Sequence, residues 1–274
     1  MNSLKERLDV VLVNRGFFQS RERAKGSIMA GIIYVDGQRV DKPGTGIKED
    51  ADIYVKEDTC PYVSRGGLKL AKAISSFQLD LEGLVAVDIG ASTGGFTDCM
   101  LKNGAKKVYS IDVGYGQLDW GLRNDPRVVN MEKVNIRYLD KEKVADKADF
   151  ISIDVSFISL KLVFPVAAEL LADDGKLMCL VKPQFEAGRE QVGKKGIIRD
   201  KAVHMEVIEK VIKYGEANGL YPQNLDFSPM TGAKGNIEYL LLLNKNDSGT
   251  DYKLIIESVV KASHETLNIN LTKS

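Results

Sequence analysis

Two charged residues directly follow apolar segments, and they are the residues of this chain best placed to do chemistry. Asp154 ends the run at 150–153, and Lys182 ends the run at 177–181. Charged residues at the carboxyl ends of parallel strands border the ligand crevice of α/β proteins. Lysine is seldom buried at such a position without a function or a partner. We therefore expect Asp154 and Lys182 to face a ligand, and a purely structural ion pair between them is the alternative.

A lysine at a strand end can remove a proton from a weakly acidic hydroxyl. An ordinary lysine has a pKa of about 10.4, so working near pH 7.5 needs roughly 4 kcal/mol of bias against the ammonium form. Burial, a second lysine and a nearby positive charge all act in that direction. Lys69, in the glycine-containing segment 64–70, is a candidate for the second lysine. Glu238 lies in the apolar segment 235–240, where a buried carboxylate needs a cationic partner.

A glycine-rich segment between an apolar strand and a helix predicts a site for a nucleotide-like cofactor. Ser92 stands where a dinucleotide fingerprint would have glycine, and the acid ahead of the turn, Asp88, is typical of S-adenosylmethionine (SAM) sites. Asp112 ends the next strand, where its carboxylate can bind both ribose hydroxyls. A turn with only a packing role is the alternative. The expected cofactor-binding residues are Asp88, Gly90, Ala91, Ser92, Thr93, Gly94, Gly95, Phe96, Asp112, Val113, Asn135 and Asp154.

If the cofactor is SAM, it donates a methyl group. The sequence favours a hydroxyl group over an atom of a nucleic-acid base as the acceptor of that methyl group. Methylation of a pyrimidine carbon usually needs a catalytic cysteine, but Cys60, Cys99 and Cys179 fall in a linker, a helix and a strand. Methylation of a base nitrogen is often marked by D/N-P-P-Y/F after the fourth strand. Here residues 154–157 read Asp-Val-Ser-Phe, which keeps the acid and lacks both prolines.

The elements that must hold these residues alternate between strands and helices. Such alternation predicts an α/β fold with a Rossmann-like, mostly parallel, doubly wound sheet and helices on both faces. A terminal helix is expected over 252–267. The expected strands are 84–89, 107–112, 150–155, 176–181 and 237–243, and the expected helices between them are 96–103, 160–172 and 202–218.

The first sixty residues predict a separate small α+β module. One short helix is expected from Leu8 and ends at Gly16, and a second is expected over 21–30 with Ser20 as its N-cap. Asp36-Gly37 predicts a tight hairpin between two strands, and a further strand is expected at 51–55. The expected domains are residues 1–60, a connector at 61–64, a large domain at 65–245 and a tail at 246–274 with a helix.

The composition limits the classes of partner. The 38 Lys and Arg balance 38 Asp and Glu, so any surface for nucleic acid must be local. Two histidines, and three cysteines without a C-x-x-C pair, predict no metal site. No apolar stretch reaches the ~18 residues of a membrane span, and residues 1–7 are unlike a signal peptide, so we expect a cytoplasmic protein. The sequence indicates no oligomeric state.

Positive charge gathers on the second expected helix of the small module. Arg21 and Lys25 share one helix face and Arg23 flanks them, so they could contact phosphates, although a solvated helix face is the alternative. The module resembles an S4 domain, a small RNA-binding unit, over residues 5–56. The resemblance rests on Arg7-Leu8-Asp9, Gly16, residues 20–24, Gly31, residues 35–37 and Lys42-Pro43. The residues assigned to RNA are Arg7, Arg21, Arg23, Lys25, Arg65, Lys194 and Lys195.

A second resemblance covers about residues 4–245. Lys69, Asp154, Lys182 and Glu238 follow the K-D-K-E order of FtsJ-like ribose 2′-O-methyltransferases, and residues 88–96 resemble their cofactor loop. With an S4 domain, S-R-G-G-L-K at 64–69, V-K-P-Q-F-E at 181–186 and G-I-I-R-D at 196–200, the chain resembles the TlyA (haemolysin A) family.

The family resemblance implies SAM-dependent methylation of a cytidine 2′-hydroxyl in ribosomal RNA. It implies ribosomal RNA or ribosomal subunits as partners. It implies Lys182 as the general base, Asp154 as the residue that orients lysine and donor, and Lys69 with Glu238 as residues that tune charge and place the ribose. A membrane-active haemolysin and a catalytically inactive RNA-binding protein are the alternatives.

Overall fold

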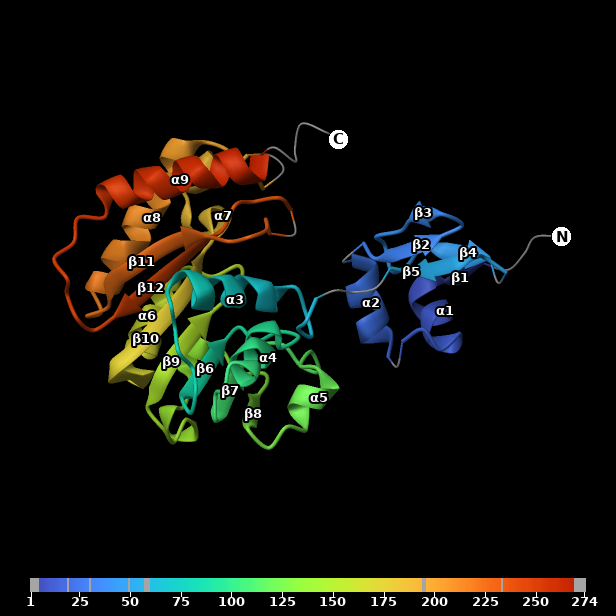
Figure 1. Ribbon diagram of the computed structural model, residues 1–274, viewed down its shortest axis with the longest axis horizontal. Helices are drawn as coiled ribbons and strands as arrows, with labels where there is room; N and C mark the ends of the chain where they lie inside the picture. Colours follow the sequence, from blue (N-terminus) through green and yellow to red (C-terminus); the bar gives the residue numbers. More distant parts are fainter. Residues whose placement is uncertain are drawn as a thin grey trace. The chain divides into compact units, whose positions relative to one another are not determined.

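The protein is described by a computed structural model that covers residues 5–18, 20–29, 31–48, 50–56, 60–193, 196–232 and 234–268. The chain divides into two compact units, residues 1–64 and 65–274 (Figure 1). Each unit has its own apolar core, so each is described by itself.

The small unit packs two helices against short antiparallel strands. Helices α1 (Leu8–Asn14) and α2 (Arg21–Met29) share a core with the sheet β3-β2-β5, made of Gln38–Arg39, Ile33–Val35 and Ile53–Val55. The Ser20 hydroxyl accepts a hydrogen bond from the Arg23 amide at 3.3 Å, as expected of an N-cap. Asp36 and Gly37 both have positive φ, which suits a tight hairpin turn. The sequence did not reveal β1 (Lys5–Arg7) and β4 (Gly46–Lys48), which pair with each other.

A seven-stranded sheet organises the large unit, in the order β11-β12-β10-β9-β6-β7-β8. Strand β12 is antiparallel to both of its neighbours, whereas β6 to β10 run parallel, which confirms the mostly parallel, doubly wound fold. The chain leaves β6 toward β7 on one side and returns to β9 on the other, so the carboxyl ends of β6 and β9 form the topological switch point where open α/β sheets bind ligands. The strands are β6 (Val85–Ile89), β7 (Lys107–Ile111), β8 (Val128–Met131), β9 (Ala148–Ile153), β10 (Leu171–Val181), β11 (Tyr221–Phe227) and β12 (Tyr239–Asn244).

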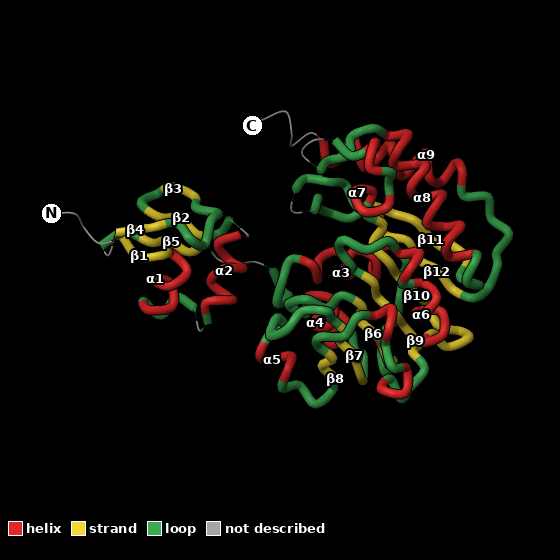
Figure 2. The backbone as a smooth tube through the Cα atoms, turned by 180° about the vertical axis from the view of Figure 1, so that it is seen from behind, coloured by secondary structure: helices red, strands yellow, loops and turns green. Residues whose placement is uncertain are grey.

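Helices cover the sheet because its central strands are apolar on both faces. Helices α3 and α4 pack together, and α9 packs against α8 and β11; Figures 1 and 2 show α9 alongside α8. The helices are α3 (Gly66–Ser76), α4 (Gly95–Lys102), α5 (Trp120–Arg123), α6 (Phe164–Leu170), α7 (Pro183–Glu186), α8 (Lys201–Glu216) and α9 (Lys253–Asn268), with 3-10 turns at Ile136–Tyr138, Lys141–Lys143, Leu160–Leu162 and Arg189–Gln191.

Several elements differ from the sequence prediction. Strands β8 and β11 were not expected, and they lie at the two edges of the sheet. Strand β11 contains Pro222 and Asp226, so it lacks the continuous apolar run from which a strand could be predicted. The helix expected over 160–172 is a 3-10 turn followed by α6, which begins next to Pro165 because proline fits the first turn of a helix. Strand β12 begins at Tyr239, so Glu238 precedes it.

Candidate active site

Three residues with positive φ shape the glycine-rich turn after β6. They are Gly90 at 90°, Ser92 at 50° and Gly94 at 93°. A Cβ on Gly90 would lie 2.4 Å from the backbone oxygen of Asp154, so only glycine lets β6 approach the segment after β9 this closely. Ser92 and Thr93 are exposed at the tip of the turn. The turn therefore offers backbone and small side chains to a ligand at the crevice.

Asp112 lies beside this turn and supplies its carboxylate. Its two oxygens accept hydrogen bonds from the Ser92 amide at 2.8 Å and the Gly114 amide at 2.6 Å, which fixes the carboxylate's position. The next side chain, Val113, is 73% exposed and leaves an apolar surface next to that carboxylate. Asn135, after β8, accepts from the Arg137 amide at 3.2 Å and begins a 3-10 turn. A fixed carboxylate beside a free apolar surface fits a ribose joined to a flat purine.

Two of the residues that we expected to bind the cofactor lie beneath the turn. The Asp88 carboxylate is fully buried and accepts hydrogen bonds from the hydroxyls of Thr97 at 2.7 Å and Ser152 at 3.2 Å. Burial raises the pKa of Asp88 to about 7, against the opposing effect of these two hydrogen bonds. Phe96 is buried in the core. Asp88, in β6, and Phe96, in α4, therefore lie in the interior next to the turn.

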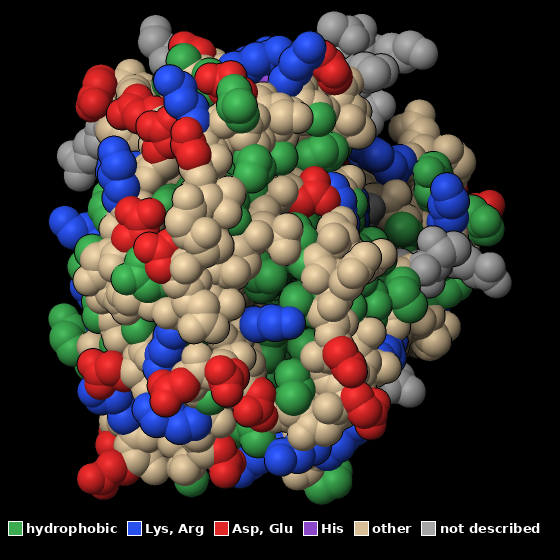
Figure 3. Space-filling view, turned by 60° about the vertical axis from the view of Figure 1, so that its left-hand side comes forward, with side chains coloured by type: hydrophobic (Ala, Val, Ile, Leu, Met, Phe, Trp, Pro, Cys, Tyr) green, Lys and Arg blue, Asp and Glu red, His purple; other side chains and the backbone are tan. Residues whose placement is uncertain are grey.

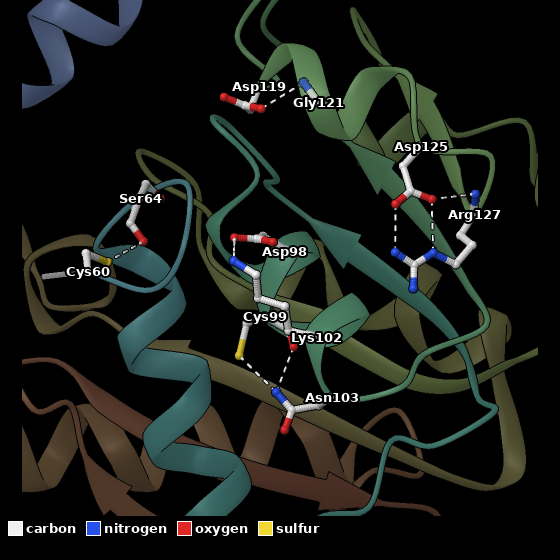
Figure 4. A network of polar contacts seen from close by, with 10 residues as sticks. All are labelled: Cys60, Ser64, Asp98, Cys99, Lys102, Asn103, Asp119, Gly121, Asp125 and Arg127. Atoms are coloured by element: carbon white, nitrogen blue, oxygen red, sulfur yellow. Dashed lines mark hydrogen bonds and ion pairs between the residues drawn. The ribbon is translucent and has the colours of Figure 1, made fainter. Parts of the chain in front are cut away.

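Helices α4 and α5 follow the turn in sequence, and Figure 4 shows polar contacts at both of them. Lys102 pairs with Asp98 one turn earlier in α4 at 2.9 Å, and the Asn103 side chain donates to the Cys99 carbonyl at 2.8 Å. Asp119 caps α5 by accepting from the Gly121 amide at 2.8 Å, and its own amide donates to the Thr93 carbonyl at 3.2 Å. The tip of the turn is thereby tied to α5.

The four residues of the expected catalytic set form two ion pairs. Lys182 Nζ lies 2.5 Å from Asp154 Oδ1, and Lys69 Nζ lies 2.5 Å from Glu238 Oε2. The Lys182 side chain is only 8% exposed. Val181 pairs with Tyr239 across β10 and β12, so Lys182 and Glu238 emerge from neighbouring strands at the same edge of the sheet. The structure therefore brings together residues up to 169 positions apart.

The charges of this cluster balance and influence one another. Burial disfavours the ammonium form of Lys69, but the carboxylates of Asp154 and Glu238 outweigh it and raise the pKa of Lys69 above its usual value. Lys69 therefore remains a cation between two carboxylates. Asp154 consequently acts on both lysines, through contact with Lys182 and through its charge on Lys69.

A second set of contacts fixes α3, the helix that carries Lys69. Lys72 donates to Asp226 at 3.1 Å and to the Phe227 carbonyl at 2.6 Å, and Ser76 donates to the other Asp226 oxygen at 2.9 Å. Lys72 and Ser76 follow Lys69 by about one and two helical turns, so they share its face of α3. The contacts with β11 therefore fix the position of α3 and so limit the positions available to Lys69 Nζ.

Sequence reasoning missed several residues around the cluster. Lys182 Nζ also donates to Ser156 Oγ at 3.2 Å. Phe157 has a φ of 63° and is 88% exposed, and its ring lies 5.0 Å from that of Phe185. Ser156 and Phe157 lie in residues 154–157, where only the D/N-P-P-Y/F motif had been considered. The buried Glu186 links the segment after β10 to the segment after β9, because it accepts hydrogen bonds from the Ser159 hydroxyl and the Leu160 amide, each at 2.7 Å. Its place in V-K-P-Q-F-E was the available signal.

The residues expected to bind RNA differ in their surroundings. Arg7 and Arg21 both contact the buried Asp9, each at 2.9 Å. One edge of each guanidinium is therefore engaged in an ion pair within the small unit. The Arg7 hydrogen bond, with help from Arg21, lowers the pKa of Asp9 to about 2 despite its burial. Arg23 and Arg65 are exposed and Lys25 is partly exposed, whereas Lys194 and Lys195 lie outside the described residues. On the face drawn in Figure 3, positive and negative side chains are interspersed.

In the part of the chain that the structure describes, no helix is long and apolar enough to cross a membrane. Nor do three or more His, Cys, Asp or Glu side chains in those ranges gather as they would around a metal ion.

Comparisons with known proteins place the chain in a family. Residues 62–245 match the FtsJ-like methyltransferase model and residues 6–53 match the S4 domain model. The "Putative rRNA methyltransferase YqxC" of Bacillus subtilis is 51% identical, with 97% of each chain covered. The 16S/23S rRNA (cytidine-2′-O)-methyltransferase TlyA of Mycobacterium tuberculosis is 38% identical, with 96% of this chain and 97% of the relative covered.

A solved structure shows the same similarity. The "Putative hemolysin from Streptococcus thermophilus" is 47% identical and superposes with a TM-score of 0.79, with 98% of this chain and 99% of that chain covered. The family matches, the similarity to TlyA over nearly the whole length and the Lys-Asp-Lys-Glu cluster agree. The chain belongs to the TlyA family of FtsJ-like methyltransferases that carry an S4 domain.

Proposed function

We propose that this protein transfers a methyl group from SAM to the ribose 2′-hydroxyl of a cytidine in ribosomal RNA. The observation that carries the proposal is the meeting of two largely buried lysine–carboxylate pairs at the edge of the sheet that holds the glycine-rich turn. The relative from Mycobacterium tuberculosis is named for this activity on 16S and 23S RNA. The S4 unit supports an RNA substrate.

The four clustered residues divide the work. SAM, when bound, supplies a methyl group made electrophilic by a sulfonium. Lys182 would accept the proton that the ribose 2′-hydroxyl loses as it takes the methyl group. Asp154 orients Lys182. Lys69, held by Glu238, offers a positive charge to the oxygen that is losing its proton.

The remaining assignments follow from the same reading. The turn 90–94, Asp112, Val113 and Asn135 would hold the cofactor, with Asp88, Gly95 and Phe96 supporting the turn. Exposed cations of the small unit, together with Arg65 in the large unit, would contact RNA phosphates. We assign residues 1–60 to RNA binding, 61–64 to a connector, 65–245 to catalysis and 246–274 to a tail.

Lys182→Ala tests the proposal. General-base catalysis contributes about 10²–10⁴-fold, so formation of 2′-O-methylcytidine in ribosomal RNA should fall at least 100-fold while SAM affinity stays within about twofold. Mass-spectrometric mapping and calorimetry measure the two quantities. Lys176→Ala is the matched control, because Lys176 is exposed on the same strand, away from its carboxyl end. Undiminished methylation in Lys182→Ala would refute the mechanism.

The alternatives predict other results. An inactive RNA-binding protein would show no SAM binding by calorimetry. A membrane-active haemolysin would release dye from liposomes at low protein concentration, and Lys182→Ala would leave that release undiminished.

A further inference from the structure

The C-terminal helix α9 lies beyond the catalytic family match, which ends at residue 245. Its inward face is largely apolar and includes Ile256, Val260 and Leu267, and the buried Tyr252 directly precedes it. Ser263 and His264 interrupt this apolar face, and both are buried. Buried polar groups cost stability unless they are hydrogen-bonded, so the contacts of these two residues indicate what the helix holds.

Ser263 and His264 contact a polar cluster formed with Tyr239 and His204. The Tyr239 hydroxyl lies 2.6 Å from His204 Nδ1 and 3.1 Å from Ser263 Oγ, and His264 Nε2 lies 3.4 Å from His204 Nδ1. His204 Nε2 lies 3.1 Å from the Ile198 carbonyl. Because a carbonyl only accepts, Nε2 carries the hydrogen, and Nδ1 is left to accept from the Tyr239 hydroxyl. Neutral His204 therefore satisfies both neighbours.

Tyr239 occupies the point where the two catalytic strand ends meet. It follows Glu238 in sequence and pairs with Val181, the residue before Lys182. The cluster also reaches the other side of Glu238: the Ile198 amide donates to the Asn236 side chain at 3.0 Å, and Asn236 donates to the Gly196 carbonyl at 2.9 Å. The polar cluster is thus anchored both just before and just after Glu238.

We propose that α9 is a positioning element of the active site. Ser263 and His264 hold Tyr239 and His204, and these fix the backbone from which Glu238 and Lys182 project toward the substrate. Helix α9 therefore acts through Tyr239 and His204 and not on the reacting atoms themselves. The expected effect on rate rests on the proposed methyltransferase function.

Tyr239→Phe and Ser263→Ala test this role, since each removes one hydroxyl and keeps the packing nearly intact. We expect kcat for RNA methylation to fall about tenfold in each, equivalent to about 1.4 kcal/mol, with SAM affinity and the KM for RNA within about twofold. Ser263→Thr, which keeps the hydroxyl, should recover most of kcat. Tyr252→Phe is the matched control, because it removes a hydroxyl from the same end of the chain outside the cluster.

Hydrogen exchange gives a readout that does not need activity. In Tyr239→Phe, amide exchange should rise at residues 181–182 and 236–239 and stay unchanged in β6 and β7. No local rise, a uniform rise over the whole sheet, or a local rise with unchanged kcat would each overturn the positioning role. If the wild-type protein methylates no RNA, the proposed function fails, and the local exchange pattern alone then decides whether α9 holds these strand ends.

Discussion

The two sides of the central sheet build their parts of the site in different ways. On the side of β6, β7 and β8, the turn and Asp112 lie within about one βαβ unit, and backbone amides fix the carboxylate. On the side of β10 and β12, four side chains from separate segments meet in two ion pairs, and one pair spans 169 positions. Local backbone geometry makes the first half, whereas tertiary packing makes the second.

This difference predicts how the two halves respond to substitution. A change in the turn should act on cofactor affinity, because the turn supplies shape. A change in the ion pairs should act on rate, because these residues supply charge where the proton leaves. The two halves also contain buried titratable groups with opposite shifts in pKa.

The largest expected effect concerns stability. The pKa of Asp88, raised to about 7 by burial, makes this group favour folding at low pH, and that contribution is lost as the pH rises from about 4 to 7. Asp88→Asn removes this group. The free energy of unfolding of the variant, minus that of wild type, should therefore be larger at pH 8 than at pH 4. The difference should be on the order of 4 kcal/mol, measured by urea unfolding.

On the catalytic side the sign is reversed. Burial lowers the pKa of His204 to about 4, with His264 acting in the same direction and the Ile198 carbonyl and Asp200 opposing it. Stability from His204 is therefore lost as the pH falls from about 6.5 to 4. Asp88→Asn leaves this loss in place, so the variant should be more acid-sensitive than wild type. Parallel pH profiles for the two proteins would contradict the buried, raised-pKa state of Asp88.

The next largest effect is expected for Glu238→Gln. Glutamine keeps the size of the side chain but leaves the buried Lys69 ammonium with less negative charge, so kcat for RNA methylation should fall about 100-fold. SAM affinity, measured by calorimetry, should stay within about twofold. Glu169→Gln, which removes an exposed carboxylate paired with Lys141, is the control. A large loss of SAM affinity in Glu238→Gln would show that the two halves are not separable.

The smallest effect, about tenfold in the Kd for SAM, is expected for Gly94→Ala. Gly94 has a φ of 93°, and a Cβ there would lie 2.3 Å from Leu122 and 2.8 Å from Leu118. Backbone strain alone costs about 1–2 kcal/mol, and the side chains of Leu118 and Leu122 must also shift. Gly83→Ala imposes similar strain at φ 71° with open space around the Cβ. A fall in kcat at saturating SAM, with unchanged Kd, would break the comparison.

The sequence revealed the two halves unequally for the same physical reason. The turn and Asp112 could be predicted because strand, glycines and acid are close in sequence. Lys182 and Asp154 could be predicted from their strand ends, whereas Lys69 and Glu238 needed the family resemblance to be placed with them. The contacts of Ser156, Glu186 and Tyr239 could not be predicted, since each depends on a partner from a distant segment. Tyr239 in particular looks like one more residue of an apolar strand.

The close approach at Gly90 couples the two halves of the molecule that were compared above. The turn and the Asp154 backbone touch there without space for a methyl group, so any side chain at position 90 must push the segment after β9 away from the turn. A substitution of Gly90 would therefore disturb the glycine-rich turn and the Lys182–Asp154 pair together.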